Sequence, residues 1–325
     1  MRQCQLGELL FFWDNGIRLR HSGLAVDIPR RQPFGFISHA HSDHIARHEL
    51  ALCTPATGEF YRLRLGNRPV REVPFGQVIQ TGNSRLCLFP AGHCLGSAML
   101  WVEAEGQTLL YTGDFRLGES ATAERAQVPR ADVLIMESTY GLPRYRMPPR
   151  SEVVELLRQR VLWACSNDWL PVVVAYSLGK AQEVLALLGP LKLPIYVHKT
   201  IYAISEVYKK FGVKLPGYEL LHENVRPPAV VIVPPGSAPS LWWPRQWKLA
   251  VTGWAIDPAT PYRLRVDEAL PLTDHADFDG LIGLVELVKP RRVYCLHGPE
   301  VFVEHLRARG WDARPLGRPT QYRLF

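Results

Sequence analysis

The first part of the chain, up to about residue 143, alternates apolar and polar positions over short segments. Segments such as 24–28, 34–37, 85–89 and 107–111 are rich in β-branched or aromatic residues, or alternate, and Gly, Pro or Asn residues bound them. Alternation over a few residues is typical of strands that bury one face. The pattern therefore predicts short strands and turns in this region.

From about residue 150 the apolar positions follow a different rhythm. Ser151 is expected to cap a helix that runs to about Asn167, and a buried strand over 171–175 follows. The pattern then predicts helices over 179–188, 200–211, 277–288 and 300–309, and strands over 229–233, 249–252 and 292–296. Such alternation is typical of a parallel sheet with helices on both faces. The sequence thus indicates an α/β protein whose middle segment forms a unit of its own.

Composition narrows the class of protein. The chain has 325 residues, of which 47% are hydrophobic and 21% charged, which excludes intrinsic disorder and a coiled coil. No apolar run approaches the roughly 18 residues of a membrane span, and the first residues lack a signal-peptide pattern, so a cytoplasmic location is expected. The six cysteines are scattered and are interpreted as reduced thiols. The net charge of +7 is compatible with a nucleic acid partner but is not sufficient to indicate one.

The strongest chemical signal is a cluster of histidine and aspartate directly after an apolar strand. Residues 37–44 read Ile-Ser-His-Ala-His-Ser-Asp-His. At the end of a strand, side chains two residues apart point to the same side, so His39 and His41 can bind one metal ion together. Beyond the turn, Asp43 and His44 can reach a second ion. The motif therefore predicts a metal site with two ions.

Two later strand ends carry residues of the same kind. His93 lies in a glycine-flanked turn after the strand at 85–89, and Asp114 follows the strand at 107–111. Together with the first motif they supply the third histidine and the bridging carboxylate that a binuclear site needs. Asp27, which closes an earlier strand, is expected to orient the ligand loop by hydrogen bonding. Imidazole and carboxylate ligands suit zinc best, with manganese as the alternative.

The order of these residues resembles the ligand series of the metallo-β-lactamase superfamily. Three later motifs are similar to those of its β-CASP nucleases: Glu137 at a strand end, His275 in Thr-Asp-His-Ala-Asp and His297 in Leu-His-Gly. The stretch 177–183, Ser-Leu-Gly-Lys-Ala-Gln-Glu, resembles the Gly-Arg-x-Gln-Glu stretch of the family's cap, with Lys180 in place of the usual arginine. Within the family, the chain is most similar to the bacterial ligase-associated DNA exonucleases.

The resemblance implies a fold and a division into domains. The expected fold is an αββα sandwich with an inserted α/β cap, the β-CASP domain. The sandwich would consist of residues 1–143 and 263–325, and the cap of residues 144–262. The metals would lie at one edge of the sandwich.

The resemblance also assigns roles to the site residues. His275 would be the general acid, with Glu137 as the hydrogen-bond partner that keeps it protonated. Ser177 and Lys180 would contact the substrate, Lys180 at a helix start where anions bind well. The expected metal ligands are His39, His41 and His93 for the first ion, Asp43, His44 and His297 for the second, and Asp114 between the two, so that Asp43 and Asp114 also count as catalytic.

The predicted function is a two-metal phosphodiesterase that hydrolyses DNA, as an exonuclease on single strands or DNA ends in repair. A DNA ligase and a helicase are the expected protein partners. His297 is typical of the RNA-processing branch, so a ribonuclease is the alternative. A small-molecule metallohydrolase is less favoured, because such substrates need neither a leaving-group acid nor a basic cap. A non-catalytic nucleic-acid-binding subunit is disfavoured because no ligand is missing from the series.

Overall fold

The computed structural model describes residues 10–237 and 243–317. The chain forms two compact units. Of the described residues, the first takes in 10–119, 123–143 and 275–317, and the second takes in 120–122, 144–237 and 243–274. Within the described ranges, every helix is too short or too polar to cross a membrane.

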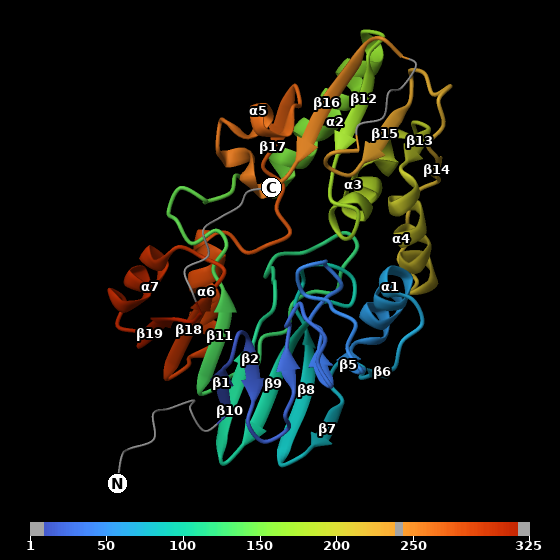
Figure 1. Cartoon of the computed structure of the whole chain (residues 1–325). Helices are drawn as coiled ribbons and strands as arrows, with labels where there is room; N and C mark the ends of the chain where they lie inside the picture. Colours follow the sequence, from blue (N-terminus) through green and yellow to red (C-terminus); the bar gives the residue numbers. More distant parts are fainter. Residues whose placement is uncertain (1–9, 238–242, 318–325) are drawn as a thin grey trace. The chain divides into compact units, whose positions relative to one another are not determined.

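Two sheets form the first unit (Figure 1). The six-stranded sheet has the order β1-β2-β3-β4-β5-β6, with β1 (Phe11–Trp13), β2 (Ile17–Leu19), β3 (Ala25–Val26), β4 (Phe34–Phe36), β5 (Leu50–Cys53) and β6 (Val70–Glu72). The seven-stranded sheet has the order β19-β18-β11-β10-β9-β8-β7, with β7 (Val78–Thr81), β8 (Ser84–Pro90), β9 (Ala98–Ala104), β10 (Gln107–Tyr111), β11 (Val133–Glu137), β18 (Arg292–Leu296) and β19 (Ala313–Pro315). The α-helices described in this unit are α1 (Pro55–Leu65), α6 (Phe278–Val288) and α7 (Glu300–Arg307).

The seven-stranded sheet buries apolar side chains on both faces. In β10, Leu109 and Tyr111 enter a core shared with the six-stranded sheet, whereas Leu110 enters a second core shared with α6 and α7. This follows from the period of two in a strand. Helix α1 contacts β6 of the other sheet. The layers are therefore helix, sheet, sheet and helix, which is the sandwich expected from the sequence.

Four neighbouring strands of the larger sheet, β10, β11, β18 and β19, are parallel, and the first three lead into the predicted metal site. Strand β11 pairs with β10 through Ile135 and Tyr111, and with β18 through Glu137 and Leu296. The carboxyl ends of parallel strands meet at one edge of a sheet. The segments that leave these three strands therefore start side by side, although β18 lies more than 150 residues after β11 in the chain.

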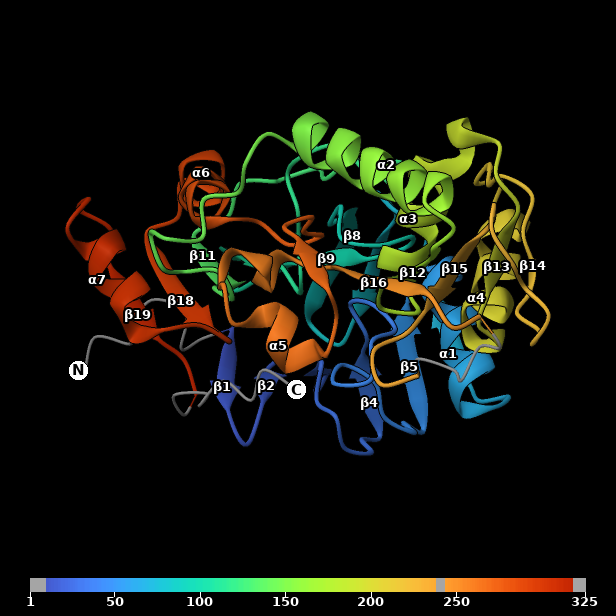
Figure 2. The ribbon, with the colours of Figure 1, turned by 90° about the horizontal axis from the view of Figure 1, so that it is seen from above.

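The second unit contains one parallel sheet with the order β14-β13-β15-β12-β16-β17. Its strands are β12 (Leu170–Val174), β13 (Ile195–Val197), β14 (Glu219–Leu220), β15 (Val230–Val233), β16 (Gln246–Val251) and β17 (Glu268–Leu270). Its helices are α2 (Arg150–Ser166), α3 (Lys180–Leu188), α4 (Lys199–Lys210), α5 (Thr260–Leu264) and the short 3-10 turns η1 (Gly189–Leu191) and η2 (Gly253–Ile256). Figure 2 shows α2 and α3 along this sheet, and apolar cores fill both of its faces. The alternating elements predicted after residue 150 are present.

Three expectations from the sequence are wrong in detail. Helix α2 begins at Arg150 after Pro149 and has no side-chain cap, so Ser151 does not cap it. Residues 263–274, expected in the sandwich, belong to the second unit, because β17 extends its sheet by pairing with β16. Helix α1 lies in a region predicted as strands and turns. Its sequence signal was present, since Thr54 caps the helix and Pro55 begins it.

Candidate metal centre

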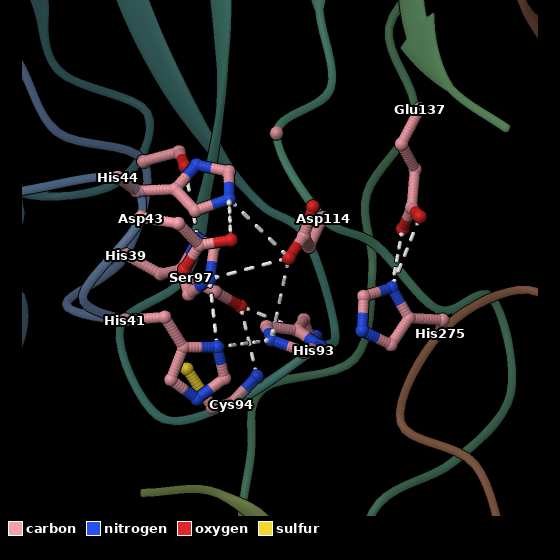
Figure 3. Close-up of polar contacts among 12 residues, drawn as sticks. His39, His41, Asp43, His44, His93, Cys94, Ser97, Asp114, Glu137 and His275 are labelled. Atoms are coloured by element: carbon pink, nitrogen blue, oxygen red, sulfur yellow. Dashed lines mark hydrogen bonds and ion pairs between the residues drawn. The ribbon is translucent and has the colours of Figure 1, made fainter. Parts of the chain in front are cut away.

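The predicted ligands lie in the loops that follow strands of the first unit. The loop after β4 carries His39, His41, Asp43 and His44, and the loop between β8 and β9 carries His93. The loop after β10 contributes Asp114. Figure 3 shows these side chains pointing toward one another. The structure thus brings together ligands from three separate segments of the chain.

One group of donors surrounds His41. The Nε2 atoms of His39 and His93 lie 3.0 and 3.2 Å from Nδ1 of His41. Asp114 Oδ2 lies 3.4 Å from His39 Nε2 and 3.9 Å from His93 Nε2. One ligand atom from each of these four residues lies within 4.8 Å of the others. Three imidazole nitrogens and one carboxylate oxygen are a suitable set of ligands for a single divalent ion.

A second group of donors meets the first at Asp114. His44 Nε2 lies 3.5 Å from Asp114 Oδ2 and 3.6 Å from Asp43 Oδ2. The same oxygen of Asp114 therefore faces both groups, as a bridging carboxylate must. His297 follows β18, and its ring centroid lies 6.2 Å from that of His44. Its side chain is exposed and lies outside the compact groups of donors, so its role as a ligand stays a prediction.

Asp27 binds the ligand loop through hydrogen bonds. Its carboxylate accepts hydrogen bonds from the Ser38 backbone N–H at 2.7 Å and from the Tyr111 hydroxyl at 2.8 Å, and contacts His44 Nδ1 at 2.8 Å. With Nδ1 held in this way, His44 presents Nε2 to Asp114. The backbone of Asp27 has φ 46°, in the left-handed region. Residues other than glycine seldom adopt this conformation, and those that do are often found at functional sites. These contacts are those that the orienting role requires, and the role itself stays a prediction.

Sequence reasoning missed the residues that hold the ligands in place. The Ser38 hydroxyl lies 3.0 Å from His39 Nδ1, so the ring turns Nε2 toward the other donors. Ser97 Oγ accepts hydrogen bonds from the backbone N–H groups of His93 and Cys94, at 3.2 and 3.1 Å. The signal for Ser38 was its position inside the histidine motif. No cysteine belongs to a metal-binding group within the described residues.

The protonation of His39 and Asp114 fits a bound cation, whereas burial of His44 is outweighed by Asp114 and Asp27, which raise the pKa of that ring to about 10, so His44 must lose its proton when it binds a metal. Burial, with the neighbouring His44, His41 and His93 rings, lowers the pKa of His39 well below its ordinary value. The ring is therefore neutral, the form that binds metals. Burial also raises the pKa of Asp114 to about 7, against the effect of His44. A cation at this position would keep the carboxylate ionised, so the donor set fits divalent metal ions.

Glu137 and His275 form a pair beside the metal ligands. His275 Nδ1 lies 2.9 and 3.0 Å from the two carboxylate oxygens of Glu137, which is buried. Burial raises the pKa of Glu137, but His275 and the hydrogen bonds from His275, Thr139 and the Phe115 N–H outweigh burial and keep the pKa below its ordinary value. The Glu137 side chain is therefore an anion that orients His275. Ligand atoms of Glu137, His275 and Asp114 lie within 4.8 Å of one another.

The two predicted substrate contacts lie in the second unit, at the start of α3. Lys180 is only 1% exposed, and its Nζ lies 3.2 Å from Glu183 Oε2 and 3.5 Å from Asp274 Oδ1. Two carboxylates already satisfy this buried ammonium, which argues against the expected contact with a phosphate. The Ser177 hydroxyl lies 3.1 Å from Thr200 Oγ1, and its contact with substrate stays a prediction.

Comparison with known proteins gives the following relatives. Residues 261–315 match the family model of the Zn-dependent metallo-hydrolase RNA specificity domain. A protein of Opitutus terrae named "Probable DNA ligase" is 39% identical over 96% of this chain, and the match covers 32% of that protein. An "RNase J-like protein" of Methanocaldococcus jannaschii is 33% identical over 40% of this chain and 33% of its own length. The chain thus spans about a third of these two relatives.

Two further similarities concern a eukaryotic protein and a solved structure. "Cleavage and polyadenylation specificity factor subunit 3" of Dictyostelium discoideum is 32% identical over 48% of this chain and 21% of its own length. A crystal structure of a protein of unknown function from Enterococcus faecalis superposes with a TM-score of 0.55 at 15% identity, over 82% of this chain and 75% of that one. At that identity the superposition supports a common fold alone.

Proposed function

Because the chain belongs to the β-CASP branch of the metallo-β-lactamase superfamily, we propose that it is a two-metal phosphodiesterase that hydrolyses DNA. In this proposal it acts as an exonuclease on single strands or DNA ends in repair. One observation carries the proposal: a single oxygen of Asp114 faces His39 and His93 on one side and His44 on the other, at 3.4 to 3.9 Å. A carboxylate shared by two groups of donors is typical of two-metal hydrolases.

The donor atoms divide between two ions, with zinc favoured and manganese as the alternative. His39, His41 and His93 would hold the first ion, and Asp43 and His44, with His297, the second. Asp114 would contact both. Bound divalent ions supply Lewis-acid stabilisation of the phosphoryl group and activate water for in-line attack.

The chain's own contribution to bond cleavage is a proton donor. His275 contacts Glu137 through Nδ1, so Nε2 is the atom from which a proton would pass to the departing sugar oxygen. The departing group of a phosphodiester is a poor leaving group that needs this proton, whereas a thiolate does not. The Glu137–His275 pair therefore favours a phosphodiester over the small esters or thioesters of a metallohydrolase for metabolites.

DNA is favoured over RNA by the extent of the similarity. The Opitutus terrae relative, whose name refers to DNA ligation, aligns with 96% of this chain. The relatives named as ribonucleases align with less than half of it. The same relative supports a DNA ligase as a partner in repair. A ribonuclease is the second candidate, because the matched family model is described as an RNA specificity domain.

The test uses end-labelled DNA and RNA oligonucleotides of one sequence, each with zinc or manganese or with a chelator. We expect metal-dependent shortening of the single-stranded DNA, step by step from one end. Asp43→Asn, which keeps the shape of the side chain, should abolish cleavage while the circular dichroism spectrum stays unchanged. Cleavage of RNA alone would replace the proposal with its second candidate. Turnover of a thioester or lactone with both nucleic acids intact would contradict both.

A further inference from the structure

A buried ionic network lies in the second unit. Lys180 Nζ contacts Glu183 Oε2 and Asp274 Oδ1, and the Arg150 guanidinium pairs with the other oxygen of Glu183. The side chains of Lys180, Glu183 and Asp274 are 1%, 3% and 14% exposed. Two cations alternate with two carboxylates, so the network neutralises its own charge.

Removing one member of such a network lowers the stability of the fold strongly. A buried charge that loses its partner costs far more than an exposed one, because water cannot replace the partner. Lys180 holds two carboxylates from separate segments, Glu183 in α3 and Asp274 in the segment after β17. Lys180 therefore links Asp274 to α3.

Asp274, and Ser120 beside Glu183, lie close in the chain to predicted residues of the metal centre. Asp274 is followed directly by His275. On the other side, the Ser120 hydroxyl donates a hydrogen bond to Glu183 at 3.3 Å, and Ser120 lies six residues after Asp114. Lys180 thus contacts the residue that precedes the predicted acid, and Glu183 contacts a residue six positions after the predicted bridging ligand.

Within the first unit, the segment after Asp114 and the segment after His275 are joined by a backbone hydrogen bond. The Ala276 backbone N–H donates to the Phe115 carbonyl oxygen at 2.7 Å. The Phe115 N–H donates to Glu137 Oε1 at 2.9 Å. The backbone around His275 therefore depends on contacts on both sides: Asp274 with Lys180, and Ala276 with Phe115.

We propose that Lys180 is a positioning residue for His275. By holding Asp274, it fixes the backbone from which the His275 ring projects toward Glu137, and so keeps Nε2 at the departing oxygen. The kinetic part of this inference rests on the proposed function, and the structural part does not. A displacement of about 1 Å in a reacting group costs on the order of 10²-fold in rate, so a remote residue can have a large effect on turnover.

Hydrogen exchange tests the structural part without any substrate. In Lys180→Met, backbone amides in peptides covering residues 273–277 should exchange at least about 10-fold faster, because their anchor is lost. Lys209→Met is the matched control: Lys209 also pairs with a glutamate three residues away in a helix of the same unit, but half of its side chain is exposed. Unchanged exchange at 273–277 in Lys180→Met would overturn the proposal.

Turnover of two substrates tests the kinetic part. Lys180→Met should lower kcat on DNA about 10–100-fold, yet lower kcat on a nitrophenyl phosphodiester only a few-fold, since that leaving group needs no proton. Lys180→Arg, which keeps the charge, should restore most of kcat on DNA. Equal losses of kcat on both substrates would contradict the positioning role and would mean that Lys180 only stabilises the fold.

A second variant covers the case in which Lys180→Met does not fold. Asp274→Asn keeps the shape of the side chain and leaves the Lys180–Glu183 pair intact, so the same two readouts apply, with the same expected and contradicting results. If the wild-type protein cleaves neither nucleic acid nor the nitrophenyl ester, the proposed function fails. The hydrogen-exchange result then still decides whether Lys180 anchors the residues around His275.

Discussion

The metal centre of the first unit and the Lys180 network of the second are both buried and polar, but they are built on opposite plans. In the network, cations and carboxylates alternate, and each charge meets its opposite. In the metal centre, His39, His93 and His44 all direct Nε2 at one oxygen of Asp114. Donors that converge on one point are suited to bind a cation, whereas alternating charges neutralise one another.

The contrast explains why similar residue types have different roles. Lys180, at the start of a helix, and His39, at the end of a strand, both occupy positions that favour ligand binding. His39 faces further donors of its own kind. Lys180 faces two carboxylates that already neutralise it. The surrounding charges, rather than the residue type, separate a binding site from a structural cluster.

The largest expected effect comes from Asp114→Asn. The amide cannot supply the negative charge that both groups of donors share, so metal content should fall from about two ions per chain to fewer than one, by elemental analysis. Turnover should lose most of the acceleration of about 10⁶-fold or more that enzymes provide. Two ions retained with normal turnover would remove Asp114 from the centre of the site.

The next largest effect is expected for His275→Ala. Loss of the proton donor should lower kcat on DNA about 10²–10⁴-fold, while a nitrophenyl phosphodiester should lose much less. Metal content should stay normal, because His275 is paired with Glu137 through Nδ1 and is not one of the expected metal ligands. His297→Ala should instead lower occupancy of the second ion and slow both substrates alike. Identical behaviour of the two variants would contradict this division of roles.

A smaller effect is expected for Asp27→Asn. The variant weakens the contact that orients His44, so affinity for the second ion should fall about 10–100-fold, measured by titration against a competing chelator. Asp132→Asn is the matched control. Its carboxylate also accepts hydrogen bonds from a backbone N–H and a hydroxyl, both of Thr108, but at the far end of β10. Equal loss of affinity in both variants would indicate a general loss of stability.

The smallest effect concerns a partly exposed group of charges, in which Arg292 and Arg314 contact Asp312 at 2.7 and 3.3 Å. Partial burial raises the pKa of Asp312, but the two arginines outweigh it and lower the pKa below its ordinary value of 3.8. The ion pairs therefore stabilise the fold fully when the pH is above 3.8, the ordinary pKa of the carboxyl group. This stabilisation is lost as the pH falls through the lowered pKa of the folded protein. Asp312→Asn should cost less than about 1 kcal/mol at neutral pH, by urea unfolding, and the difference should shrink in acid and in high salt. A difference in unfolding free energy that grows in acid would contradict the predicted pH dependence.

The proximity of His39 and His41 was predictable from the sequence because it is local, whereas their approach to His93 and Asp114 joins three segments of the chain. His39 and His41 are two residues apart at a strand end, and the period of a strand puts them on one side. Asp27 was predictable for a similar reason, as the last residue of a short apolar segment. What the sequence did not show was Tyr111 behind Asp27, since that contact joins strands of two different sheets.

Lys180 and the boundary near residue 263 show where local reasoning fails. The start of α3 has the pattern of an anion site, yet its neutralising partner, Asp274, lies 94 residues later in the chain. Residues 263–274 follow the last strand predicted in the middle segment, over 249–252, and the pairing of β17 with β16 assigns them to the second unit. Both outcomes depend on tertiary pairing, which local patterns do not encode.

The parallel pairing of β11 with β18 has a consequence for synthesis of the protein. Ser138, just after β11, bonds to Leu296, which is made 158 residues later. At about 5–20 residues per second, the ribosome needs about 8–30 s to supply that partner. During this time the free edge of β11, a strand buried along its whole length in the finished protein, has no neighbour. An unpaired apolar edge favours aggregation, so the nascent chain should need a chaperone most in the interval between these two strands.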